Sequence, residues 1–436
     1  MPPVSLRLLF LLLPLVFMAG CREMQSDYRR PPAMPPAAVA MPAGIGFNPG
    51  GPELASYTDA TGQYPLASRR TWWQASHSVD GFSRLDQILP ANMVAKADAP
   101  SLWRRAVSEP TITYATQQTG SRRLTIDEYL ARNPATGLLI ARGDTIHVER
   151  YQYGRTDVHR LTSFSMAKTV TALLVGLAVA DGAITSIDDP AERYVPGLKD
   201  SEYGRTPIRH LLTMSSGVRF DEDYSGRDDV SRMVAAMMFP QATGGPAAVR
   251  QFNQRIAPPG QRWSYASAET QVLGLVLRAA IKRPITEYLS ERIWKPIGAE
   301  SDASWVVDAS GQEATFAYFN AVLRDYARLG MLLANGGKVS ERQVIPADWL
   351  REMTRAHFTS TQTGRWFGYG FQTWIFPDND GSFALLGVRG QAIYVDPARR
   401  LVMVHTAVRP QARDPGGAET TALWRGVKAA FPKVSP

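Results

Sequence analysis

The apolar run from Ser165 to Ala180 constrains the fold of this chain more than any other feature. After Lys168 it carries almost no polar side chain, and it has the length of a helix. A helix without a polar face must be buried on most sides. We therefore expect a large fold in which sheet and helices surround this segment, with Lys168 near its buried beginning.

Strand patterns lie on both sides of a helical middle. Residues 136–141 and 145–151, joined by a turn at Gly143-Asp144, predict a β-hairpin. Further strands are expected at 383–388, 392–395 and 401–408, and helices at 208–214, 268–282, 320–335 and about 419–431. The expected fold class is α+β, with an antiparallel sheet built from the N- and C-terminal strands, flanking helices and a mostly helical second lobe.

Size and charge exclude several classes of protein. At 436 residues with 44% apolar content, the chain has enough apolar side chains for a large core, which excludes a disordered or fibrous protein. The formal net charge of +8 comes from Lys and Arg spread along the sequence, without a basic run or a zinc-finger pattern. We therefore expect no nucleic-acid partner.

The N-terminus predicts export. Arg7 is followed by an apolar run from Leu8 to Met18, which is too short for an ordinary membrane span and is typical of a signal peptide over residues 1–20. Met18-Ala19-Gly20-Cys21 is similar to a bacterial lipobox, so we expect a lipid on Cys21, the only cysteine of the chain. That lipid would anchor the protein in the cell envelope, in the outer membrane facing the periplasm. The alternative is a plain secretory signal with an incidental cysteine.

The residues after Cys21 are expected to form a tether. Residues 21–68 are rich in Pro, Ala and Gly and lack apolar periodicity, as in an extended linker. The folded domain is expected over 69–436, with an N-terminal extension to about residue 125. In this extension, Trp72, Trp73 and Phe82 are expected to dock on the main body as packing anchors.

Ser165 and Lys168 form the strongest chemical signal. Residues at positions i and i+3 share one face of a helix, so the hydroxyl and the amine can touch. A serine becomes a good nucleophile when a base accepts its proton, and burial can lower a lysine pKa toward neutrality. The start of the helix would also stabilise an oxyanion. These residues predict a nucleophile at Ser165 and a base at Lys168.

Further motifs follow in order: Asp181-Gly182-Ala183-Ile184, then Ile208 to Gly217 (IRHLLTMSSG), then Tyr265-Ala266-Ser267. With the serine and lysine, this order resembles the penicillin-recognising serine hydrolases, in particular their class C β-lactamase-like branch. The resemblance implies a β-lactamase/transpeptidase-like fold and a role for Tyr265 as second general base or acid. Ser267 would extend the hydrogen-bond network, and this serine variant is similar to the esterase and 6-aminohexanoate-dimer hydrolase groups.

The third element of that family is a Lys-Thr-Gly-like strand beside the nucleophile, and Gly387 to Gln391 (GVRGQ) stands in its place. Val388 takes the position of the cation, so the usual grip on a β-lactam carboxylate is missing unless Arg389 substitutes for it. Gly390 would let the strand approach an acyl group. The backbone amides of Gln391 and Ser165 are the expected oxyanion hole. Tyr224, in the acidic loop after Gly217, is expected either to border the cleft or simply to pack.

The sequence lacks the GxSxG motif of α/β-hydrolases and the HExxH motif of zinc proteases, and we expect neither a metal nor a cofactor. The resulting hypothesis is a serine hydrolase that opens a small ester, amide or peptide-like substrate through an acyl-Ser165 intermediate. A β-lactamase or D-alanyl-D-alanine carboxypeptidase is the first alternative. An inactive binding lipoprotein of the envelope is the second. Substrate identity and oligomeric state cannot be read from the sequence.

Overall fold

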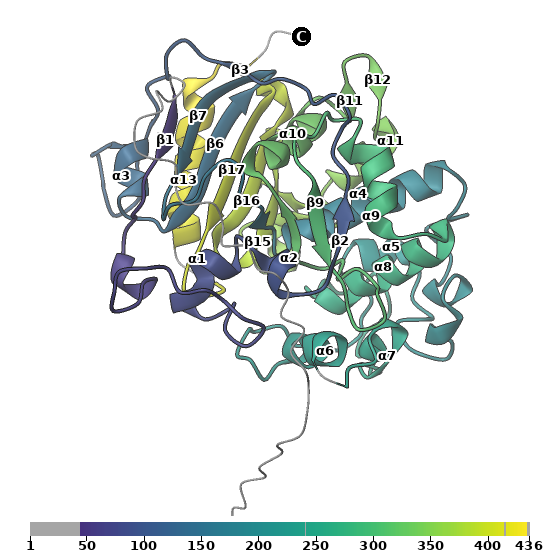
Figure 1. Cartoon of the computed structure of the whole chain (residues 1–436). Helices are drawn as coiled ribbons and strands as arrows, with labels where there is room; N and C mark the ends of the chain where they lie inside the picture. The colour runs from purple at the N-terminus through teal and green to yellow at the C-terminus, as the bar shows by residue number, and fades with distance from the viewer. Residues whose placement is uncertain (1–43, 240, 414–415, 434–436) are drawn as a thin grey trace, which may run out of the picture. The chain divides into compact units, whose positions relative to one another are not determined.

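The computed structural model describes residues 44–239, 241–413 and 416–433. The predicted signal peptide, Cys21 and the first part of the predicted tether lie outside these residues. The described chain combines a large sheet with helices on both of its faces (Figure 1). No helix in these ranges is long and apolar enough to cross a membrane.

The large sheet joins strands from the two ends of the chain, as the sequence predicts. Eight of its nine strands within the described ranges follow the order β1-β7-β6-β17-β16-β15-β14-β13, and the ninth, β3, pairs with β7. The sheet is mixed rather than purely antiparallel, because β1 and β3 run parallel to β7. The strands are β1 (Ile45–Phe47), β3 (Arg104–Arg105), β6 (Ala135–Arg142), β7 (Thr145–Tyr151), β13 (Gly368–Tyr369), β14 (Trp374–Ile375), β15 (Phe383–Gly387), β16 (Gln391–Asp396) and β17 (Leu401–Ala407).

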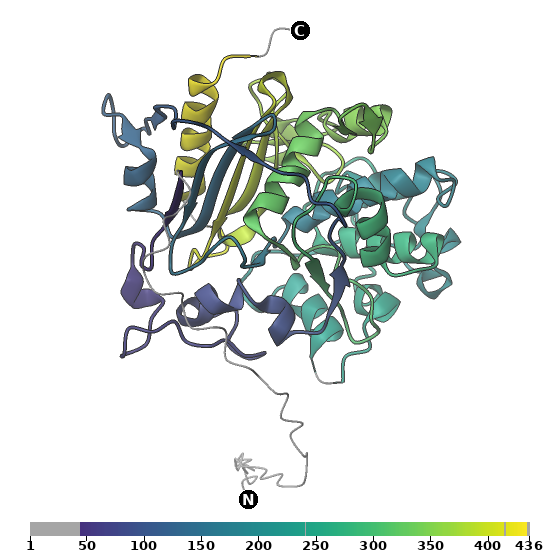
Figure 2. The same cartoon turned by 45° about the horizontal axis from the view of Figure 1, so that its top comes forward.

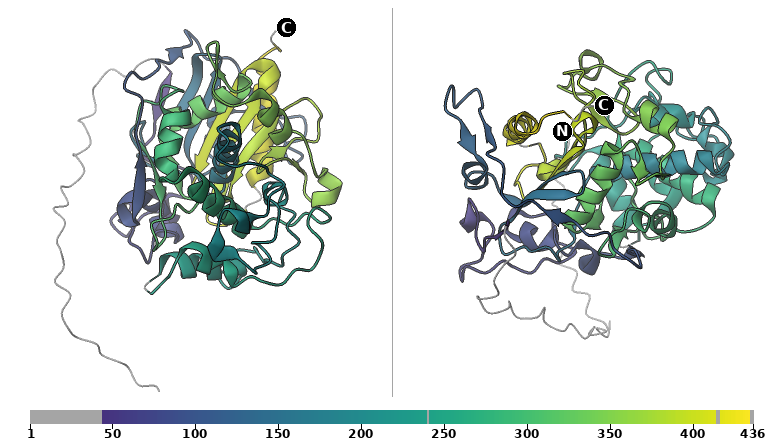
Figure 3. Two further views of the ribbon diagram at one scale, coloured as in Figure 1. Left: turned by 90° about the vertical axis from the view of Figure 1, so that its right-hand side faces the viewer. Right: turned by 90° about the horizontal axis from the view of Figure 1, so that it is seen from above.

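Helices cover both faces of this sheet. Successive side chains of its central strands point to opposite sides, so each strand contributes apolar side chains to both faces. In β17, Leu401 and Met403 pack with the helix α13 (Gly416–Ala430), whereas Val402 and Val404 belong to the core on the other face. That second face carries α10 (Leu323–Ala334). Figures 2 and 3 show the sheet between α13 on one side and α10 with the helical lobe on the other.

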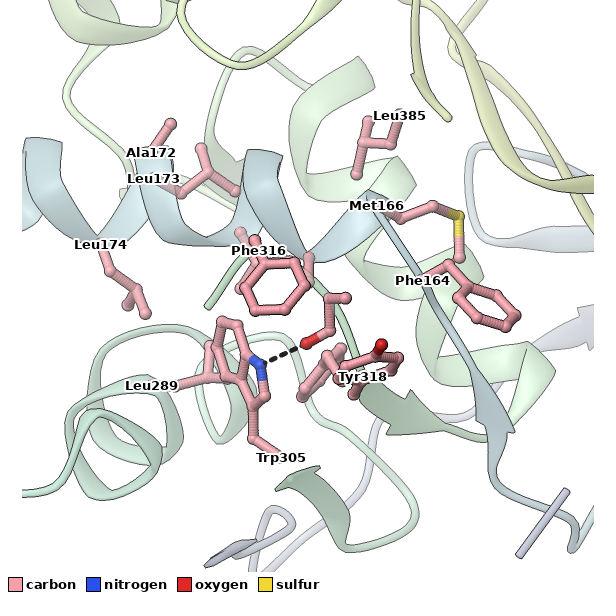
Figure 4. Close-up of a cluster of buried hydrophobic side chains, with 14 of the residues drawn as sticks. Phe164, Met166, Ala172, Leu173, Leu174, Leu289, Trp305, Phe316, Tyr318 and Leu385 are labelled. Carbon is pink, nitrogen blue, oxygen red and sulfur yellow. Dashed lines mark hydrogen bonds between the residues drawn. The ribbon is translucent and has the colours of Figure 1, made fainter. Parts of the chain in front are cut away.

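The helical lobe surrounds α4 (Met166–Ala180), which the sequence predicts as a buried helix; α4 packs on α8 (Ser267–Ile281). Figure 4 shows Leu173 and Leu174 of α4 among other large apolar side chains. The remaining helices are α1 (Ser78–Gly81), α2 (Leu85–Ile88), α3 (Ile126–Leu130), α5 (Ile208–Leu212), α6 (Asp229–Met238), α7 (Gly245–Arg250), α9 (Ile285–Leu289), α11 (Ala347–Met353) and α12 (Ser360–Thr363).

A smaller antiparallel sheet, in the order β2-β9-β10-β8, leads directly to α4. Its strands are β2 (Ala91–Val94), β9 (Ala303–Val306), β10 (Phe319–Ala321) and β8 (Leu161–Thr162). Two short hairpins complete the strands: β4 (Thr113–Tyr114) with β5 (Leu124–Thr125), and β11 (Lys338–Val339) with β12 (Arg342–Gln343). Because β8 ends just before the predicted nucleophile, this sheet fixes where α4 begins.

The folded part starts earlier than the sequence predicts. Residues assigned to the tether pair with the sheet at β1, and Tyr57 is fully buried with its ring 5.3 Å from that of Tyr153. A three-residue strand has no periodicity of its own, and only the open edge of β7 defines it. Trp72 and Phe82 pack in the core as expected, whereas Trp73 is 39% exposed.

Candidate active site

Ser165 stands at the N-terminal end of α4, immediately after the residue in left-handed conformation that joins β8 to the helix, Phe164 (φ 41°). The serine is partly exposed and lines a cleft of about 1210 Å³. The cleft is large enough for a substrate the size of a drug molecule. A nucleophile at this point would act at the positive end of a 15-residue helix.

Lys168 is buried directly beneath the serine. Its Nζ atom lies 3.1 Å from Ser165 Oγ, 3.0 Å from Ser267 Oγ and 2.9 Å from the carbonyl oxygen of Phe316. Burial lowers the pKa of the Lys168 amine to about 8, while the negative charge of Glu222 acts in the opposite direction. The predicted pair is therefore in contact, and its amine loses its proton far more easily than an ordinary lysine does.

Tyr265 completes the contacts around the nucleophile. Its side chain is hydrogen-bonded to that of Ser165, and its ring centroid lies 5.0 Å from Lys168 Nζ. The ring stacks on Trp374 with centroids 5.5 Å apart. Burial, together with the nearby carboxylate of Glu222, raises the pKa of Tyr265 above its ordinary value. The resting side chain is therefore a neutral phenol, which can donate a proton to a departing group.

Glu222 is the functional candidate that the sequence analysis does not single out. Its carboxylate accepts hydrogen bonds from the backbone N–H of Ser267 at 2.7 Å and from Ser267 Oγ at 2.8 Å. Tyr224 donates its hydroxyl to the same carboxylate at 2.8 Å. Glu222 is only 6% exposed, whereas Asp221 and Asp223 beside it are exposed. Nothing in this run of three acids marks the middle one, because its burial depends on α8.

Tyr224 and Arg389 both line the cleft, as two of the predicted binding residues should. The Arg413 guanidinium lies 5.2 Å from the centroid of the Tyr224 ring. Arg389 donates to the backbone carbonyls of Arg409 and Pro410, at 3.1 and 2.6 Å. Arg413 also lines the cleft and donates to the backbone carbonyl of Glu222 at 2.6 Å, so backbone oxygens hold both guanidinium groups.

The third predicted element lies beside the nucleophile in a different register. Gly387 ends β15 so close to the nucleophile loop that a Cβ there would be 2.4 Å from the carbonyl oxygen of Ser163. Val388, the next residue, lines the cleft together with Ser165. The predicted residues Gly390 and Gln391 instead border a neighbouring pocket. The strand turns over Val388 to Gly390, so Gly390 and Gln391 lie on the far side of this turn, and Gln391 pairs with Gly387.

The side chain of Gln391 is hydrogen-bonded to the backbone of the neighbouring strand β17. Its Nε2 donates to the carbonyl of Ala407 at 2.7 Å, and its Oε1 accepts from the N–H of Ala407 at 3.2 Å. His405 donates its Nδ1–H to the carbonyl of Gly390 at 2.6 Å, which holds the turn against β17. No group of three or more His, Cys, Asp or Glu side chains in the described ranges is placed to hold a metal ion.

The chain is similar in sequence to a family of known proteins. The chain matches the family named Beta-lactamase over residues 123–424. It is 25% identical over 394 residues to the 6-aminohexanoate-dimer hydrolase of Paenarthrobacter ureafaciens, covering 87% of this chain and 96% of that protein. The match with the family spans all the candidate residues, from Ser165 to Val388.

Solved structures share the fold. A putative 6-aminohexanoate-dimer hydrolase from Bacillus anthracis superposes with a TM-score of 0.74 at 22% identity, covering 84% of this chain and 98% of that one. A family VIII carboxylesterase superposes with a TM-score of 0.53 at 18% identity, covering 68% and 93%. Both confirm the predicted β-lactamase-like architecture.

Proposed function

This chain belongs to the Beta-lactamase family of serine hydrolases, and we propose that it cleaves an ester or amide through an acyl intermediate on Ser165. The observation that carries the proposal is the set of hydrogen bonds around Lys168. Two of the three bonding directions of its amine are taken by Ser267 and Phe316, and the third is directed at Ser165 Oγ.

The direction of each hydrogen bond follows from what its atoms can donate. The carbonyl of Phe316 only accepts, so it takes one N–H of Lys168. The Ser267 hydroxyl gives its proton to the Glu222 carboxylate and must accept the second N–H of Lys168. In the neutral amine, the remaining position is the lone pair, and it points at Ser165. Lys168 can therefore accept the serine proton without any rearrangement.

Acylation then proceeds in two steps, in which three protons move. Ser165 Oγ forms a bond to the carbonyl carbon as its proton moves to Lys168 Nζ, and the tetrahedral intermediate carries a negative oxygen. The bond to the leaving group breaks as that group takes a proton from the Tyr265 phenol, and Lys168 returns a proton to the phenolate. A water molecule then attacks the acyl carbon by the reverse sequence and releases the acid.

The oxyanion needs two N–H donors, and we assign them to Ser165 and Val388. Both residues line the cleft, and the close approach of Gly387 to the nucleophile loop brings the start of the turn to Ser165. Such donors are already fixed before the charge develops, which is why they stabilise the transition state strongly.

We propose a linear ester or amide rather than a β-lactam as the substrate. Val388, directly after β15, takes the position of the family's cation, and Arg389, which also lines the cleft, is held by the carbonyls of Arg409 and Pro410 and not placed on the strand. The relatives named as 6-aminohexanoate-dimer hydrolase and carboxylesterase act on a linear amide and on esters, according to their names.

Intact-mass measurement after exposure to a fluorophosphonate tests the proposal. The wild type should gain one adduct, and Ser165→Ala should gain none. Ser231→Ala is the matched control, because Ser231 lines the same cleft and its loss should leave labelling intact. An unlabelled wild type, or equal labelling of Ser165→Ala, would refute the acyl-serine mechanism. Stable labelling by benzylpenicillin would support the β-lactam alternative.

We also propose that the chain is exported and lipidated on Cys21, on the strength of the Met18 to Cys21 lipobox. Metabolic labelling with an alkyne-bearing fatty acid in a Gram-negative host should mark the wild type and not Cys21→Ser. Equal labelling of the two would favour the plain secretory signal.

A further inference from the structure

The cleft at Ser165 has one strongly apolar wall, and that wall comes from two segments far apart in the sequence. Val230, Val234 and Met238 recur every fourth residue of α6, so they form one stripe on the helix, and all three line the cleft. Phe239, at the end of α6, also lines it and is 52% exposed.

The N-terminal extension contributes further apolar side chains to this cleft. Trp73 and Leu89 line it, although both precede the family match, which starts at residue 123. Trp73 contacts Trp72 edge to face, with ring centroids 5.7 Å apart. Trp72 in turn lies against Tyr318, another residue of the cleft, with centroids 5.6 Å apart. The extension therefore forms part of the cleft.

Isolated apolar side chains on a surface are ordinary, but several in one concave site indicate an apolar ligand. Here they converge on the nucleophile, since Phe164 and Phe316 line the same cleft beside Ser165. Figure 4 shows Phe164, Phe316 and Tyr318 around the first turn of α4.

Resting on the function proposed above, we infer that this wall binds an apolar acyl chain several carbons long. The acyl part is favoured over the leaving group by the position of Tyr265, which is hydrogen-bonded to Ser165 and packs against Tyr369 and Trp374 and not against α6. A leaving group that takes its proton from Tyr265 must lie beside the Tyr265 hydroxyl at Ser165. The acyl chain then occupies the wall formed by Trp73, Leu89 and α6.

A series of p-nitrophenyl esters from acetate to octanoate tests the inference. Wild-type kcat/KM should rise about two- to fourfold for each added methylene that the wall buries. Trp73→Ala and Phe239→Ala should each lower the octanoate-to-acetate ratio of kcat/KM by about fivefold or more. The ratio compares two substrates of one preparation, so a partly folded variant cannot imitate the effect.

Trp366→Ala is the matched control. Trp366 is 41% exposed, nearly the same as Trp73 at 39%, but it borders the neighbouring pocket. Its loss should keep the wild-type ratio. Hydrolysis of the acetate ester without any chain-length dependence would overturn the inference and leave the acyl-serine mechanism standing. An equal fall in the octanoate-to-acetate ratio for Trp366→Ala would also overturn the inference. Failure to hydrolyse any ester, together with no labelling of Ser165, would instead remove the proposed function.

Discussion

Glu222 accepts two hydrogen bonds from Ser267, one from its backbone N–H and one from its hydroxyl, at 2.7 and 2.8 Å. This pair joins the loop after α5 to the first turn of α8. It also decides which way the Ser267 proton points, and through it the direction of the lone pair on Lys168.

Glu222→Ala should therefore lower kcat by about a hundredfold, the lower limit for general base catalysis. Without the carboxylate, the Ser267 hydroxyl is free to donate to Lys168 and to occupy the lone pair that serves Ser165. Steady-state kinetics on a p-nitrophenyl ester would measure the loss. Asp221→Asn, an exposed acid of the same loop, is the control and should keep the wild-type kcat. Equal rates in wild type and Glu222→Ala would contradict this role.

The pH dependence of kcat/KM should report the Lys168 amine. Its pKa of about 8 means that activity rises as the pH increases through 8, because only the neutral amine accepts a proton. Glu222 favours the ammonium form, so Glu222→Gln should move the midpoint of this rise to lower pH. A profile that is flat between pH 6 and 9 would rule out Lys168 as the base.

Val388→Pro should lower kcat by about a hundredfold to a thousandfold, because proline lacks the N–H assigned to the oxyanion hole. Gly387, the preceding residue, has φ −124° and ψ 153°, a conformation that residues before proline prefer. Val388→Ala keeps the N–H and serves as the control in the same kinetic assay. Full activity of Val388→Pro would indicate that another backbone N–H, such as that of Gln391, is the oxyanion-hole donor.

Buried Glu269 should make stability depend on pH. It accepts from Ser216 Oγ at 2.6 Å, and burial raises its pKa to about 8 from an ordinary 4.5. Between pH 4.5 and 8 the folded chain therefore holds a proton that the unfolded chain releases, and stability falls as pH rises. Thermal denaturation from pH 6 to 9 should show the wild type losing Tm relative to Glu269→Gln. Parallel curves for the two proteins would contradict the prediction.

Gln391 illustrates where sequence reasoning reached its limit. The sequence predicts the run from Gly387 to Gln391 beside the nucleophile, and Val388 and Arg389 line the cleft with Ser165, whereas Gly390 and Gln391 border a neighbouring pocket. The difference comes from the turn at Arg389 and Gly390, which have φ 60° and 94°. A glycine-rich run permits several turns, and only the pairing of β15 with β16 selects one of them.

The sequence by itself determined α4 and the contact between Ser165 and Lys168, because a helix of apolar residues places positions i and i+3 on one face whatever surrounds it. It also determined the strands at both ends, through their local alternation. Tertiary structure alone decided that Glu222 is hydrogen-bonded to Ser267 and that Val388, Trp73 and α6 line one cleft with Ser165. These arrangements bring together residues far apart in the chain. Their geometry depends on the conformations of the connecting loops, which a local sequence pattern does not determine.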